Sequence, residues 1–151
     1  MAISQAMVTS FKVQILEGVH NFGSGVIRAS AAADVFKLAL YTSSATLGAS
    51  TTAYSATDEV SSSGTNYPAG GLTLTISQVP TSTGTTAFLD FDDLTFASAT
   101  ITANGALIYN ATQGNKAVAV LAFGSDKTST AGNFTIQFPA STSTTAILRI
   151  A

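Results

Sequence analysis

The chain has 151 residues, of which 46% are hydrophobic and only 9% are charged, with a formal net charge of −2. The length favours one domain with its own hydrophobic core, and the composition excludes an intrinsically disordered chain, which would combine low hydrophobicity with high net charge. Six basic residues against eight acidic ones offer no electrostatic footprint for nucleic acid, and the absence of cysteine excludes disulfides and thiolate metal sites.

Hydroxyl groups take the place of charges on this chain, because 41 residues are Ser or Thr. An ordinary soluble domain carries about 25% charged residues. Since charged residues are depleted from the cores of protein interfaces, a hydroxyl-rich surface of low charge suits burial against other subunits. We therefore expect a subunit of an assembly. On composition alone, an extracellular Ser/Thr-rich β domain is the alternative.

The first predicted element is an N-terminal helix over about residues 4–18. Ser4 can cap it, and Met7, Phe11 and Ile15 recur every four residues to form one apolar stripe. No basic segment followed by an apolar run opens the chain, and no stretch approaches 18 apolar residues. We therefore expect neither a secretory signal nor a transmembrane helix.

The next two segments differ sharply in composition. Residues 34–42 predict a strand, with Phe36 and Leu38 on one face and Lys37 on the other. Residues 43–70 then form a polar excursion that is longer than most loops in a compact domain. We expect it to contain short local structure around residues 52–60 or to reach out and contact a neighbour. Because it has too few apolar residues to pack on itself, it is a candidate contact element.

From residue 71 to the end, short apolar runs alternate with turn residues. Residues 72–76 alternate as a strand, and residues 80–86 are interpreted as a turn-rich gap. Residues 110–115 predict the turn of a hairpin, because Gly and Asn tolerate positive φ. About eight short strands of this kind predict a mainly β protein, with residues 1–151 forming a single antiparallel β-sandwich or jelly-roll-like domain.

Few side chains could carry chemistry. His20 is the sole histidine, and a lone histidine without cysteine cannot build a zinc site, so we expect a packed or capping role. Asp90, Asp92 and Asp93 come nearest to a metal site, but their spacing lacks the glycine and glutamate of a calcium loop. We expect a solvated strand face there, no cofactor and no enzymatic activity.

The four tyrosines of the chain are a further candidate surface. Tyr41, Tyr54, Tyr67 and Tyr109 could stack on a sugar or contact another protein. No sequence feature places them together, so four separately packed rings are the alternative.

Several stretches carry a resemblance to a known group of proteins: residues 10–13 with 16–22, residues 36–47, residues 52–60 with 67–71, and Ala106-Leu107-Ile108-Tyr109-Asn110 with Lys116-Ala117-Val118-Ala119. Together they resemble small virion-associated structural proteins of tailed bacteriophages, over nearly the whole chain. The resemblance implies a place in a phage particle assembled in the host cytoplasm, as a head decoration (cement) protein or a tail-associated component. It brings no catalytic motif.

We expect a capsid decoration protein that stabilises the head as a homo-oligomer, in contact with the major capsid protein or other virion proteins and without nucleic-acid or membrane partners. The alternatives are a tail, neck or fibre-attachment component and, from another class, a carbohydrate-binding or adhesive module. Candidate interface residues come from the N-terminal helix and the polar excursion: Met7, Phe11, Tyr54, Asp58, Glu59 and Tyr67.

Overall fold

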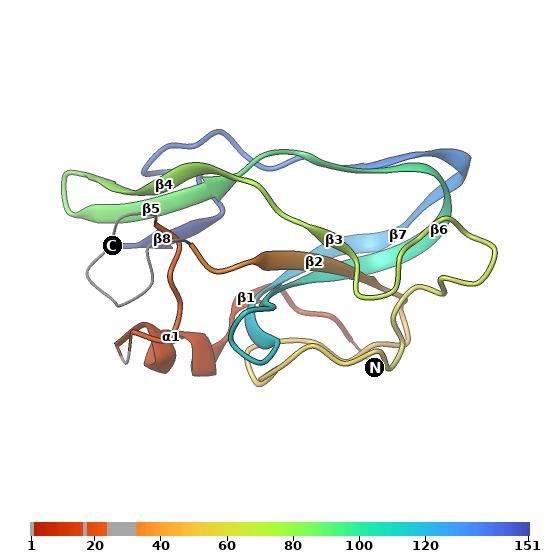
Figure 1. Cartoon of the computed structure of the whole chain (residues 1–151), viewed down its shortest axis with the longest axis horizontal. Coiled ribbons are helices and arrows are strands. Elements are labelled where there is room, and N and C mark those ends of the chain that lie inside the picture. The colour runs from red at the N-terminus through yellow and green to blue at the C-terminus, as the bar shows by residue number, and fades with distance from the viewer. Residues whose placement is uncertain (1, 17, 24–32) are drawn as a thin grey trace.

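Two facing antiparallel layers form this protein, whose computed structural model describes residues 2–16, 18–23 and 33–151 (Figure 1). Along the described residues the elements are β1 (Ala6–Met7), α1 (Thr9–Leu16), β2 (Phe36–Tyr41), β3 (Leu72–Thr73), β4 (Ile76–Thr83), β5 (Thr86–Phe91), β6 (Leu94–Asn110), β7 (Lys116–Ile136) and β8 (Leu148–Ile150). The predicted fold class, mainly β with about eight antiparallel strands and one N-terminal helix, is confirmed. The helix is shorter than predicted, because residues 6 and 7 pair with β7 as a strand.

The first layer is a five-stranded sheet in the order β1-β7-β6-β2-β3. β2 lies inside it and pairs with β6 through partners such as Leu38 and Ile108. Leu38, Ala39 and Leu40 are all completely buried, so β2 is covered on both faces and its sequence is almost continuously apolar. The predicted strand at residues 34–42 is therefore confirmed, although its two faces do not divide into a buried and an exposed one.

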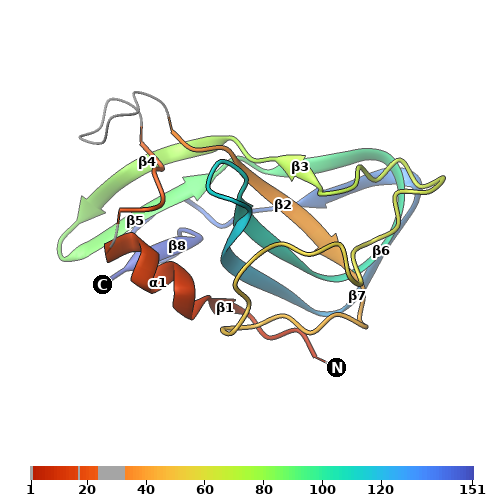
Figure 2. The ribbon, with the colours of Figure 1, turned by 60° about the horizontal axis from the view of Figure 1, so that its bottom comes forward.

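A single long ribbon, formed by β6 and β7, joins the two layers. β6 has 17 residues and β7 has 21, and they pair along their whole length with register shifts near Phe96, Ala99 and Ala103. Positive φ at Ser98 and Gly124 accompanies these irregularities. Because bulges bend a ribbon and increase its twist, β6–β7 turns back over itself, and each half lies in a different layer (Figures 1 and 2).

The second layer also contains a separate three-stranded sheet, in the order β4-β5-β8. The predicted gap at residues 80–86 is wrong in part, since β4 runs on to Thr83 and the turn to β5 is short. Pro80 is tolerated inside β4 because β4 is the edge of its sheet, where no ladder hydrogen bond needs the missing N–H.

Aromatic rings fill the space between the layers. Phe36 of β2 lies 6.1 Å from Phe91 of β5, measured between ring centroids, and Phe22 stacks on Phe36 at 4.1 Å. Phe11 of α1 meets Phe22 edge-on at 6.0 Å. Through these rings α1, which runs alongside β8 in Figure 2, is joined to the core.

Candidate functional site

Glu59 holds together separate parts of the polar excursion of residues 43–70. Its Oε2 atom accepts a hydrogen bond of 2.7 Å from the Tyr54 hydroxyl. Its Oε1 atom accepts two more, each of 2.7 Å, from the Tyr67 hydroxyl and the Gly70 backbone N–H. One carboxylate therefore ties together three points of the excursion.

All four tyrosines of the chain gather around this carboxylate, and we call them the tyrosine cluster (Tyr41, Tyr54, Tyr67 and Tyr109). Tyr109 stacks on Tyr54 with ring centroids 4.7 Å apart, and its hydroxyl donates to the Gly70 carbonyl at 2.8 Å. The Tyr41 hydroxyl donates to a backbone carbonyl of the excursion at 2.7 Å. Three of these rings are no more than 3% exposed. The tyrosine cluster therefore packs inside the protein and holds the excursion in place through hydrogen bonds. The prediction that these tyrosines form an exposed stacking surface is wrong.

Burial keeps the phenols of the tyrosine cluster protonated. It raises the pKa of Tyr41, Tyr54, Tyr67 and Tyr109 above the ordinary value of 10.0, and the nearby negative charge of Glu59 raises each pKa further. Protonated phenols donate hydrogen bonds and are poor bases. The geometry and the pKa directions thus both suit a structural role.

The polar excursion packs against its own chain, although its sequence was interpreted as having too few apolar residues to do so. Its few apolar side chains enter the core, among them Ala45 and Val60. The Val60 N–H donates to the Leu40 carbonyl of β2 at 2.9 Å, which adds part of the excursion beside the sheet. The number of apolar residues alone does not predict this packing, because the Glu59 carboxylate accepts the hydrogen bonds of polar groups that would otherwise be buried without a partner.

The predicted interface residues are mostly unavailable to another protein. Phe11 and Tyr67 are each 2% exposed and belong to the core, so neither can be a surface contact in this conformation. Tyr54 and Glu59 are partly buried in the tyrosine cluster. Met7 is also partly buried, and Asp58 alone among the six has a fully exposed position.

A second polar cluster centres on Asn110, which is completely buried at the end of β6. Its Nδ2 atom donates to Asp34 Oδ2 at 2.8 Å and to His20 Nδ1 at 3.0 Å. Its Oδ1 atom accepts from the backbone N–H groups of Thr112 and Gln113, each at 3.1 Å. These contacts fix the orientation of the amide, so His20 Nδ1 is an acceptor and its ring proton lies on Nε2.

The Asn110 cluster joins segments that are distant in sequence. Asp34 Oδ2 also accepts from the Asn21 backbone N–H at 3.0 Å, and the Asp34 N–H donates to the Asn21 carbonyl at 2.8 Å. The hairpin turn after β6 is thus bound to the residues that precede β2. With Nδ1 engaged in this way, His20 has the packed role that its sequence context predicts.

The three aspartates near the end of β5 do not converge. No group of three or more His, Cys, Asp or Glu side chains suited to holding a metal occurs among the residues that the structure describes. Asp92 is exposed, and Asp93 Oδ1 accepts from the Phe138 N–H at 2.8 Å.

Asp90 departs from the predicted solvated face. It is 1% exposed, its Oδ1 accepts from the Phe91 N–H at 2.9 Å, and within the described part of the chain its Oδ2 has no hydrogen-bond partner. Burial raises the pKa of this carboxyl, an effect that the Phe91 N–H partly opposes.

The outer side of the β6–β7 ribbon presents a surface that sequence reasoning missed. We call it the threonine face; it comprises Thr95, Thr100, Thr102, Thr128, Thr130 and Thr135, all exposed. Thr95 and Thr135 are cross-strand partners with hydroxyls 2.9 Å apart, and Thr102 lies opposite Thr128. No residue of β6 is charged. The sequence shows threonines alternating with apolar residues, which indicates an exposed strand face. It does not show the register of the two strands, which decides which threonines lie side by side.

Comparisons with known proteins add no further assignment. No protein-family model, curated protein or solved structure matches this chain. Within residues 2–16, 18–23 and 33–151, no helix has the length and apolar character needed to cross a membrane. The function is therefore argued from the residues and their geometry.

Proposed function

We propose that this chain is a structural protein of a tailed-phage particle, a head decoration (cement) protein that stabilises the shell through contacts between subunits. The threonine face is the observation that carries the proposal. It is an exposed and uncharged β surface built from two paired antiparallel strands.

The chemistry of the threonine face suits permanent burial. Each hydroxyl can donate and accept a hydrogen bond, and removing it from water costs far less free energy than removing a charge. Interface cores are depleted in charged residues for the same reason. The nearest charges on the ribbon are Asp126 and Lys127, which lie toward the bend at one end of the face.

The rigidity of the rest of the molecule supports the same proposal. The tyrosine cluster and the Asn110 cluster hold the longest loop and the hairpin turn in fixed positions. A surface that is already ordered loses less conformational entropy when it binds, so a larger part of the contact free energy appears as affinity. In a shell, each added contact stabilises only the assembled state.

Charged substitutions on the threonine face test this proposal. We expect the double variant Thr100→Lys/Thr102→Lys to bind purified phage heads that lack this protein at least about tenfold more weakly than the native chain, because two charges would have to be buried. The matched control is Thr81→Lys/Thr83→Lys, which adds the same two charges at exposed threonines of β4 and should bind within about twofold of the native chain. Equal binding by all three proteins would contradict the proposal.

A further inference from the structure

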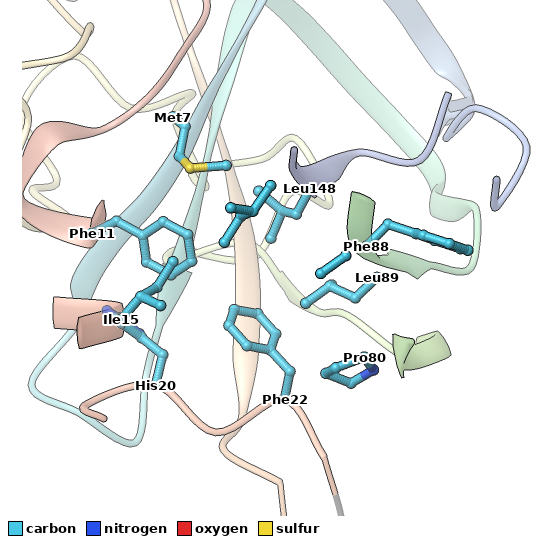
Figure 3. A pocket seen from close by; sticks show the side chains of 11 residues that line it. Met7, Phe11, Ile15, His20, Phe22, Pro80, Phe88, Leu89 and Leu148 are labelled. Carbon is cyan, nitrogen blue, oxygen red and sulfur yellow. The ribbon is translucent and has the colours of Figure 1, made fainter. Parts of the chain in front are cut away.

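An apolar pocket of about 180 Å³ lies between the N-terminal elements and the second layer (Figure 3). Met7 of β1 with Phe11 and Ile15 of α1 form one wall, and Leu89 of β5 with Leu148 of β8 form the opposite wall. In Figure 3 these side chains surround an open space and come from both sides of it. No charged side chain is among the described residues that line the pocket.

The pocket leads from the surface into the core. Phe11 and Leu148, in its interior, are 2% and 4% exposed, whereas Ile150 at its rim is 51% exposed. Ala87, another lining residue, is also exposed. A small molecule can therefore reach buried apolar surface here without an opening of the sandwich.

The volume decides the size of the ligand. An apolar cavity of about 150 Å³ is enough to bind benzene, whereas sites for drug-sized molecules span about 300–1,000 Å³. At about 180 Å³ this pocket accommodates one aromatic ring or a short hydrocarbon chain. It is too small to form a protein interface by itself, since a stable interface buries about 800 Å² on each partner.

The lining decides the charge of the ligand. His20 is the one titratable side chain among the described lining residues, and its Nδ1 atom accepts a hydrogen bond from Asn110 Nδ2. In that arrangement the imidazole is neutral and supplies no counter-charge. An ionised ligand would lose its hydration without compensation, which is costly in an apolar site.

We propose that this pocket binds a small, uncharged, apolar ligand of the size of one aromatic ring. This inference rests on the pocket alone and is independent of the proposed function. Benzene is the probe of choice, with benzoate as the charged counterpart that adds a carboxylate to the same ring. For a ligand of so few non-hydrogen atoms, we expect a Kd on the order of 1 mM for benzene.

Ligand-observed NMR on the full chain measures this binding. We expect benzene to bind at least about tenfold more tightly than benzoate, because of the desolvation cost of the carboxylate. Ala87→Leu should weaken benzene binding at least about tenfold, since the added side chain fills the pocket from an exposed position. The matched control is Ala97→Leu, an exposed alanine of β6 outside the pocket, which should leave the Kd within about twofold.

Three results would overturn the inference: no benzene binding up to about 10 mM, equal binding of benzene and benzoate, or unchanged binding by Ala87→Leu. Should Ala87→Leu fail to fold, Ile150→Trp provides a second variant at the exposed rim. Its larger ring should obstruct the mouth and weaken benzene binding in the same direction, and unchanged binding by a folded Ile150→Trp would count against the pocket equally.

Discussion

At the scale of single residues, Glu59 shows how one charge can organise a long polar segment. Its two carboxylate oxygens receive three hydrogen bonds from the excursion of residues 43–70. Hydrogen bonds to a charged group contribute about 1.5–3 kcal/mol each, and a buried donor left without a partner costs a comparable amount. The ordered path of this segment therefore depends on Glu59 more than on its few apolar residues.

Removing this carboxylate should be strongly destabilising. We expect Glu59→Ala to lower the free energy of unfolding by about 2–4 kcal/mol, because two tyrosine hydroxyls and one backbone N–H lose their acceptor. Urea unfolding at pH 7 measures the change. The control is Asp58→Asn, which alters the exposed neighbour at a position of φ 60° that Asn tolerates and should change the stability by less than about 0.5 kcal/mol. Similar losses in both variants would show that Glu59 has no special role.

The raised pKa values of the tyrosine cluster predict a loss of stability in alkali. In the unfolded chain the phenols ionise near pH 10, while in the folded chain their pKa is higher. Above pH 10 the unfolded state therefore binds fewer protons than the folded state, and stability falls as the pH rises. Each participating tyrosine contributes up to about 1.4 kcal/mol per pH unit.

Unfolding titrations between pH 8 and 11 measure this slope. The stability should be nearly constant below pH 9 and fall steeply above pH 10, and Tyr54→Phe should make the fall shallower by removing one ionisable group. A flat profile up to pH 11 would mean that these phenols ionise as easily in the folded protein as in the unfolded chain.

Asp90 predicts a pH effect of the same sign in the acidic range. Burial raises the pKa of its carboxyl, so the ionised form is disfavoured in the folded state, and stability should increase as the pH falls through the raised pKa toward 3.8. Asp90→Asn removes the charge, so it should raise the unfolding midpoint at pH 7 and abolish this contribution to the pH dependence. A variant that is less stable than the native chain at pH 7 would indicate that the ionised carboxylate is favourable where it lies.

At the scale of elements, the strand at residues 36–41 and the hairpin turn at residues 110–115 were predictable, because each depends on local signals. The alternation of apolar residues marks the first, and Gly114 and Asn115 adopt the positive φ expected of the second. The long strands β6 and β7 were not predictable. Their bulges interrupt the alternation of side chains, so that one ribbon looks like several short strands in the sequence.

The turn before β3 illustrates a constraint that only the structure reveals. Gly71 has φ 70°, and a Cβ atom placed on it would lie 1.8 Å from the Leu38 carbonyl oxygen, so the backbone itself would have to move. Gly84, in the turn between β4 and β5, has φ 60° with nothing within 4 Å of the corresponding Cβ position. Alanine substitutions at these two glycines therefore distinguish the free-energy cost of positive φ, which both share, from the cost of a steric clash, which arises only at Gly71.

We expect Gly71→Ala to lower the free energy of unfolding by more than about 3 kcal/mol, and Gly84→Ala by only about 1 kcal/mol, the usual cost of positive φ for an L-residue. Chemical denaturation of both variants provides the comparison. If the two losses are equal, β2 and the turn can separate at little cost.

At the scale of the whole molecule, the sequence predicted the class of fold, but most of the residues that it proposed as contacts are buried or partly buried in the folded chain. The hydroxyl-rich composition indicates an assembly protein, and the N-terminal helix and the long polar excursion of residues 43–70 are the predicted contact elements. In the folded chain Val60 and Tyr67 bury that segment's apolar groups, while the threonine face lies on the other long element, the β6–β7 ribbon. Which threonines share one face depends on the pairing of Thr95 with Thr135 and of Thr102 with Thr128, which local sequence does not encode.

The most direct test of the proposed role is to count this chain in purified particles of a tailed phage whose genome carries its coding sequence, by quantitative mass spectrometry against the major capsid protein. A head decoration protein should be present on the order of hundreds of copies per particle, following the symmetry of the shell. Roughly tens of copies or fewer would fit a tail component and contradict the head assignment. Its absence from intact particles would contradict the proposal.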